Sequence, residues 1–183
     1  MFGLKKKVLE SRAAATVFQA IEADCDRGLG AFGAHIEQTY REGFESAPPP
    51  FVDVRSNIVL CIHSMELQSV RNVYVSDQAD RLISHTLKLL SRSYSNADPS
   101  REIEGYWSYS KQGIEIGSAE SAVMAIPTRL YIRLLGESPS ESYAEEYVGR
   151  SPLDVVAVAE ALFSCIGIGR WKRIYNQFKL MSH

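Results

Sequence analysis

The chain has 183 residues, three cysteines and a formal net charge of −2 at pH 7. That length suits one domain with its own core and leaves little room for two. The small negative charge excludes a general attraction to nucleic acid or anionic membranes, so any such binding would have to be local.

The cysteines and the apolar runs indicate a cellular compartment. Cys25, Cys61 and Cys165 are widely spaced and form no C-x-x-C pair, which disfavours both a disulfide framework and a cysteine-rich zinc site. The longest run without Asp, Glu, Lys or Arg is residues 56–65, far short of the roughly 18 residues of a membrane helix. The N-terminal segment lacks a clear signal-peptide cleavage site. We therefore expect a soluble, cytoplasmic protein.

The first segment contains a glycine motif. Gly28, Gly30 and Gly33 have the G-x-G-x-x-G spacing of a dinucleotide site, and Asp53 follows at about the distance of a ribose-binding acid. However, apolar residues keep one helical phase through the glycines, whereas a strand-to-helix turn would interrupt it. We predict one long helix, or two nearly collinear helices that break near residues 28–33, and no dinucleotide. The small residues Gly30 and Gly33 would admit another helix closely. The helical phase is carried by Val8, Ala15, Phe18, Cys25, Leu29, Phe32 and Ile36.

Prolines at residues 48–50 end this helical region. Residues 51–75 suit helix or strand, and we favour a helix over 56–70. Ser76 is a candidate cap for the next helix, which ends near residues 95–100. Residues 105–117 alternate aromatic or apolar residues with polar ones about a turn, which predicts a short β-hairpin.

The second half of the chain is again helical. Residues 118–136 follow a helical pattern that contains Pro127, so we expect a kink or two helices there. Residues 137–147 are acidic and form either a linker or a short polar helix. Ser151 and Pro152 are a strong helix start, and glycines at 167 and 169 separate that helix from a final one that reaches Met181.

These patterns predict a mainly α fold, a single-domain helical bundle of about six or seven helices over residues 1–183, with room for one short β-hairpin. An isolated hairpin would need to pack against the helices.

Catalytic and metal-binding motifs are incomplete. His35 and Glu37 match the H-x-E part of the zinc deaminase motif, but the cysteine ligands are missing. Cys61 and His63 would share one face of a strand, yet they point to different faces of a helix. We predict no catalytic residue, no cofactor and no metal site, and we lean against an enzyme.

The chain termini carry local positive charge. The final segment places basic residues beside an aromatic stripe, a composition suited to an acidic partner, a membrane surface or nucleic acid. The simplest interpretation is a helix docked on the core with its charges in water. A second basic cluster near the N-terminus could lie beside the first and enlarge it. The final cluster is Arg170, Lys172, Arg173 and Lys179, and the second is Lys5, Lys6, Lys7 and Arg12.

We interpret the chain as a non-catalytic protein–protein interaction module that uses apolar helix faces, such as an adaptor, a dedicated chaperone or a neutralising partner. The expected partner is another protein, and a homo-oligomer is compatible with the sequence. The candidate partner-binding residues are Trp171, Lys172, Arg173, Tyr175 and Phe178.

Two alternatives stay open. The chain could be an enzyme or small-ligand receptor whose pocket is gathered from distant helices. A weaker alternative is binding of nucleic acid or a membrane surface through the terminal basic clusters, which predicts steep weakening with added salt. The residues to inspect for a pocket are His35, Asp53, Cys61, His63, His85 and Tyr109.

Overall fold

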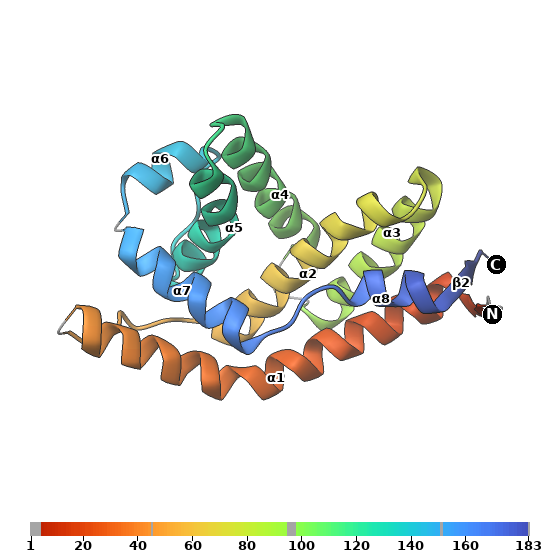
Figure 1. The fold of residues 1–183 in the computed structure, drawn as a ribbon, viewed down its shortest axis with the longest axis horizontal. Coiled ribbons are helices and arrows are strands. Elements are labelled where there is room, and N and C mark those ends of the chain that lie inside the picture. Colours follow the sequence, from red (N-terminus) through yellow and green to blue (C-terminus); the bar gives the residue numbers. More distant parts are fainter. Residues whose placement is uncertain (1–4, 45, 95–97, 151, 183) are drawn as a thin grey trace.

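A computed structural model of the chain describes residues 5–44, 46–94, 98–150 and 152–182. It confirms the mainly α fold predicted from the sequence (Figure 1). The helices are α1 (Glu10–Gly43), α2 (Val54–Val73), α3 (Ser76–Ser93), α4 (Pro99–Glu115), α5 (Ala119–Leu134), α6 (Tyr143–Val148), α7 (Pro152–Cys165) and α8 (Arg170–Gln177), and the strands are β1 (Lys6–Leu9) and β2 (Phe178–Met181).

Helix α1 runs along nearly the whole length of the molecule, and α2 lies at the centre (Figure 1). Helix α2 contacts α1, α3, α4, α5 and α8, and its apolar residues 58–62 are all buried. The helix predicted over residues 56–70 is therefore confirmed. Helices α4, α5 and α6 form a group at one end, whereas both chain termini lie together at the other (Figure 1).

The glycine motif lies inside α1, so it does not follow a strand as a dinucleotide site would require. A Cβ atom at Gly28 would be 2.8 Å from the carbonyl oxygen of Cys165, so this glycine lets the end of α7 approach α1 closely. At Gly30 and Gly33 a Cβ atom would meet open space. The prediction that Gly30 and Gly33 admit another helix is thus wrong for the described residues, where the close approach is at Gly28.

The hairpin predicted over residues 105–117 is wrong, because this stretch belongs to α4. Asp98 caps the helix by accepting a hydrogen bond from the backbone N–H of Arg101 at 3.2 Å. Gly113, which lies where the hairpin turn was predicted, is a contact point, since a Cβ there would be 2.8 Å from Cβ of Ala125 on α5. The apparent alternation was part of a helical spacing, whose buried members are Pro99, Ile103, Tyr106, Tyr109, Ser110 and Gly113.

Three further local predictions have clear outcomes. Helix α5 continues through Pro127 as one helix, and the acidic stretch contains the short helix α6. Helix α3 begins at Ser76, but Val75 is its N-cap residue and no side chain caps it. The predicted cap at Ser151 falls outside the described residues.

The only sheet in the described residues joins the two ends of the chain. Strands β1 and β2 pair in parallel, with Lys6 opposite Phe178 and Lys7 opposite Lys179. The final helix therefore ends at Gln177, and the residues after it form a strand instead of the further helical turn predicted to reach Met181. Val8 and Leu180 pack against the core and attach the sheet to the helices.

Within the described residues, the stretch Pro152–Gln177 is long and apolar enough, by length and composition alone, to cross a membrane. Asp154 and Glu160 interrupt its first part, and Arg170, Lys172 and Arg173 interrupt its second. In the structure it is two helices separated by residues 166–169, and Gly169 there has a left-handed φ of 92°. Arg170, within the stretch, is buried and ion-paired with Asp24 and Glu66.

We predict opposite effects of alanine at two glycines of α1. Gly30→Ala should stabilise the fold by about 0.5–1 kcal/mol, because the methyl group meets open space and alanine favours the helix. Gly28→Ala should destabilise it by about 1–3 kcal/mol, because the methyl group collides with backbone of α7. Urea unfolding of both variants measures the difference, and equal stabilisation by the two would contradict the close approach at Gly28.

Candidate functional site

The strand pairing places the N-terminal lysines beside Lys179 of the final basic cluster, in agreement with the prediction that the two clusters can lie side by side. Residues directly opposite each other on paired strands direct their side chains to the same face, so Lys7 and Lys179 are neighbours. Lys5, two residues before Lys7, lies on the same side of β1. Lysines from both ends of the chain therefore share one face of the sheet.

These lysines line a hollow of about 490 Å³ together with aromatic residues. Lys5 donates a hydrogen bond to the backbone oxygen of Tyr175 at 2.6 Å, and its Nζ lies 4.7 Å from the centre of the Tyr175 ring. The Tyr175 ring meets Tyr74 edge-on, with centroids 5.3 Å apart. We call this hollow the terminal surface; its lining residues are Lys5, Lys7, Tyr74, Gln78, Tyr175, Phe178, Lys179 and Leu180.

The positive charges of this end are not neutralised within the part of the chain that the structure describes. Elsewhere most arginines have acidic partners, for example Arg55 with Glu22 at 2.6 Å and Arg81 with Glu10 at 2.8 Å. Like charges directly opposite each other on paired strands repel, so the facing pair Lys7 and Lys179 opposes the sheet. The basic residues here without a described ion pair are Lys5, Lys6, Lys7, Lys172, Arg173 and Lys179.

Buried ion pairs hold the C-terminal side of the terminal surface in place. The carboxylate of Glu66 on α2 accepts hydrogen bonds from the backbone N–H groups of Arg170 and Trp171 at 3.0 and 3.3 Å. It also accepts one from the guanidinium of Arg170 at 3.0 Å, and the same guanidinium donates to Asp24 on α1. Glu66 thus neutralises the positive end of α8 and fixes the helix that leads directly into β2.

A second buried carboxylate holds the N-terminal side. Glu10, the first residue after β1, accepts hydrogen bonds from Gln78 at 3.0 Å and from Arg81 at 2.8 Å. The hydrogen bonds from Arg81 are the largest cause of a lowered pKa at Glu10. Since Gln78 also lines the terminal surface, this contact ties β1 and α3 together at the hollow.

The five residues predicted to bind a partner differ in how far they are exposed. Trp171 is fully buried, with 0% of its surface exposed, so it belongs to the core and supports the surface from below. Lys172 and Arg173 are exposed, and Tyr175 is 44% exposed. Phe178 is partly buried and lines the hollow.

Sequence reasoning missed the contribution of the α2–α3 junction to this surface. Tyr74 and Gln78 line the hollow, yet residues 51–75 could be read as helix or strand, and Gln78 carries no local signal. Lys5 and Lys7 were noted for their charge. Their contact with residues near the other end of the chain depends on strand pairing, which no local pattern indicated.

The residues considered for an enzyme pocket are dispersed. Cys61 and His63 are buried in α2, His35 is on α1, His85 on α3 and Tyr109 on α4. None of these five lines any of the four described hollows, and neither does Asp53. The described residues form no group of three or more His, Cys, Asp or Glu side chains able to hold a metal ion.

The pKa values of Cys61 and His63 disfavour a catalytic pair of a thiolate and a histidine base. Burial raises the pKa of the Cys61 thiol well above its ordinary value, which disfavours the nucleophilic thiolate. Burial, with a smaller effect of Arg170, lowers the pKa of His63 to about 3. The His63 ring stacks on Phe18 at 5.3 Å, and neither ring nitrogen has a hydrogen-bond partner among the described residues.

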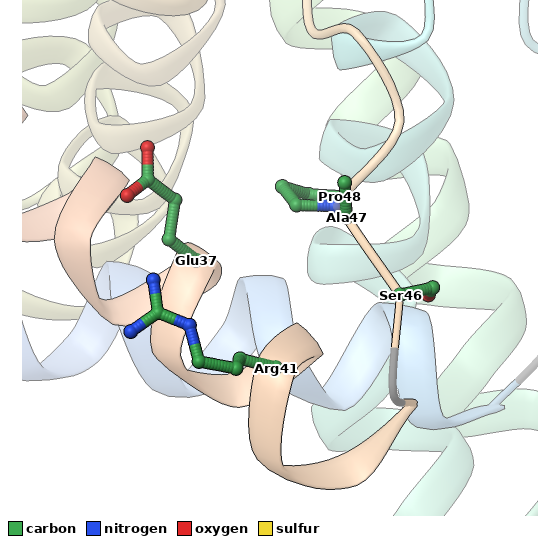
Figure 2. Close-up of a pocket in the computed structure, with 5 residues that line it drawn as sticks. All are labelled: Glu37, Arg41, Ser46, Ala47 and Pro48. Carbon is green, nitrogen blue, oxygen red and sulfur yellow. The ribbon is translucent and has the colours of Figure 1, made fainter.

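A larger hollow, of about 630 Å³, lies between the end of α1 and the chain that follows it. Figure 2 shows Glu37 and Arg41 on successive turns of α1, across the gap from Ala47 and Pro48. The polar part of its lining consists of the Glu37 carboxylate, the Arg41 guanidinium and the Ser46 hydroxyl, and no histidine lines it. Because no hydrogen bond joins Ser46 to Glu37 among the described residues, the hollow does not present an activated serine.

An exposed apolar row on α7 is a second candidate for protein binding. Leu153, Val156 and Phe163 follow helical spacing and are exposed by 61%, 37% and 46%. The row fits the prediction of an apolar helix face, but it carries no feature that specifies what covers it.

Comparisons with protein-family models, curated proteins and solved structures gave no match to this chain.

We predict that reversing one lysine of the facing pair stabilises the fold. Lys7→Glu should place a carboxylate opposite Lys179 and raise the free energy of unfolding by about 0.5 kcal/mol. Lys88→Glu, the same exchange at an exposed site on α3, should leave stability nearly unchanged. Urea unfolding at low salt measures both, and destabilisation by Lys7→Glu alone would contradict the repulsion.

We also predict that buried His63 makes the fold acid-sensitive. The unfolded chain binds a proton at His63 below its ordinary pKa of 6.5, whereas the folded chain binds it only near 3. Stability should therefore fall as the pH drops below 6.5, and this residue alone should account for a loss of about 2 kcal/mol by pH 5. Urea unfolding at pH 7 and pH 5 should show a smaller loss for His63→Leu than for the unaltered chain. The variant His85→Leu, at a half-buried position on α3, should keep most of the loss, and an equal loss in both variants would contradict the role of His63.

Proposed function

We propose that the protein is a non-catalytic, cytoplasmic protein-binding module whose terminal surface binds an acidic segment of another protein. The observation that carries this proposal is the set of unneutralised lysines that shares one hollow with two tyrosines. Adaptors, dedicated chaperones and neutralising partners all act by binding another protein, and a basic hollow suits an acidic one.

The charges of the terminal surface favour binding of an anionic partner. Lys7 and Lys179 repel each other in the isolated chain, and carboxylates placed between them would convert repulsion into charge-assisted hydrogen bonds. The neighbouring Tyr175 offers a rigid ring with a polar tip, a residue type enriched at protein interfaces. Lys172 and Arg173 on α8 extend the positive charge beyond the hollow.

The small extent of the surface favours a protein segment over nucleic acid or a membrane. Each strand has only four residues, whereas tight nucleic-acid binding uses many phosphate contacts along a basic stripe. The chain as a whole is acidic, with a net charge of −2, which opposes a long polyanion beyond the hollow. The apolar part of the lining, Phe178 and Leu180, also suits side chains of a peptide.

The experiment compares three anionic probes by fluorescence anisotropy or co-sedimentation. They are a labelled 20-residue poly-glutamate peptide, a DNA duplex of similar charge, and vesicles that contain an anionic phospholipid. We expect binding of the peptide that weakens as salt is added, because the contacts are solvent-exposed ion pairs. The double variant Lys7→Glu/Lys179→Glu should weaken peptide binding by roughly tenfold or more.

The control is Lys88→Glu on α3, made alone and then together with Lys111→Glu on α4, which matches the change in net charge. Both control positions are exposed lysines outside the terminal surface. If the double control weakened peptide binding as much as Lys7→Glu/Lys179→Glu does, the loss would be due to net charge alone, which would contradict the proposed site. Tighter binding of DNA or vesicles than of the peptide would overturn the choice of a protein partner.

A further inference from the structure

The terminal sheet is incomplete as a sheet. Parallel sheets are normally covered on both faces, and a ribbon of two strands is marginally stable by itself. Here two parallel strands of four residues stand at the end of the molecule, with no third strand among the described residues (Figure 1). Their outer edges therefore have no strand partner in the part of the chain that the structure describes.

The free edge of β1 offers backbone groups for one more strand. Along a strand, N–H and C=O groups point alternately to one side and to the other, so those not directed at β2 face this edge. Exposed strand edges are ready templates for another extended chain. The edge of β1 therefore has backbone donors and acceptors that can pair with an added strand, independently of the charge of its side chains.

The side chains of β1 determine which kind of strand can pair with its free edge. Lys6 and Lys7 are exposed, and Lys5 immediately precedes the strand. A second copy of β1 would set lysine against lysine, and like charges on neighbouring strands repel. Lysines on an edge protect it from such self-pairing, but they favour an incoming strand that carries carboxylates.

We propose that the acidic partner binds as an extended strand added to the free edge of β1, which enlarges the sheet to three strands. This inference rests on the function proposed for the terminal surface and names the conformation of the partner. Acidic side chains at alternate positions of the added strand face Lys5 and Lys7, which line the hollow with Lys179. The backbone of the added strand hydrogen-bonds to that of β1.

The test separates backbone pairing from charge by using three peptides of identical charge. The first is a ten-residue peptide of alternating glutamate and threonine. In the second the glutamate amides are N-methylated, and in the third the threonine amides. Amides of alternate residues point to opposite edges of a strand, so only one of the two methylated sets faces β1.

We expect the unmodified peptide to bind the full chain and one methylated peptide to bind about tenfold more weakly, through lost backbone hydrogen bonds. The other methylated peptide should bind nearly as well as the unmodified one. Hydrogen exchange of amides in residues 6–9 should slow at least several-fold on binding. The variant Lys88→Glu, on α3, should reproduce all of these results.

Two other outcomes overturn the inference in different ways. If all three peptides bind equally, or if poly-glutamate binds and the unmodified alternating peptide does not, the added strand is wrong and acidic binding stands. If neither poly-glutamate nor the alternating peptide binds, both the added strand and the proposed function are wrong.

Discussion

The placement of α8 and β2, and with them of the terminal surface, depends on the carboxylate of Glu66. It is buried in α2 and accepts hydrogen bonds from two backbone N–H groups at the start of α8 and from the guanidinium of Arg170. Burial of a carboxylate is unfavourable unless its oxygens have partners, and here the helix end and Arg170 provide them. Because β2 follows α8 directly, this contact also sets where β2 can pair with β1. The position of the C-terminal half of the terminal surface therefore follows from one buried charge.

Charge is used in two ways in this molecule. Buried or half-buried acids pair with arginines, as Glu10 does with Arg81 and Glu66 with Arg170, and these pairs fix helices relative to one another. Arginine suits that role because its planar group makes several hydrogen bonds at once. The unpaired cations at the terminal end are mostly lysines on flexible, solvated side chains, which remain free to meet a ligand. A chain that is weakly acidic overall thus presents one positive surface.

The sequence predicted local structure better than long-range contacts. The spacing of apolar residues correctly predicted that helix α1 continues through its glycines, because the same helical phase is present on both sides of Gly28. It failed at Gly113, where a glycine at a helix–helix contact resembled a turn residue. Parallel pairing of Lys7 with Lys179 joins residues from opposite ends of the chain, so no local pattern reveals it. Trp171 looked like a partner-binding residue because its neighbours are charged, yet the core takes up its side chain.

The most direct measurement is a map of backbone amide chemical shifts as an acidic peptide is added to the isotope-labelled chain. We predict that the shifts change along residues 5–9 and 175–181 and at Tyr74 and Gln78, where β1, β2 and the α2–α3 junction meet. The shifts of α7 should stay unchanged. Changes centred on the exposed row of Leu153, Val156 and Phe163, with the terminal strands unchanged, would contradict binding at the terminal surface.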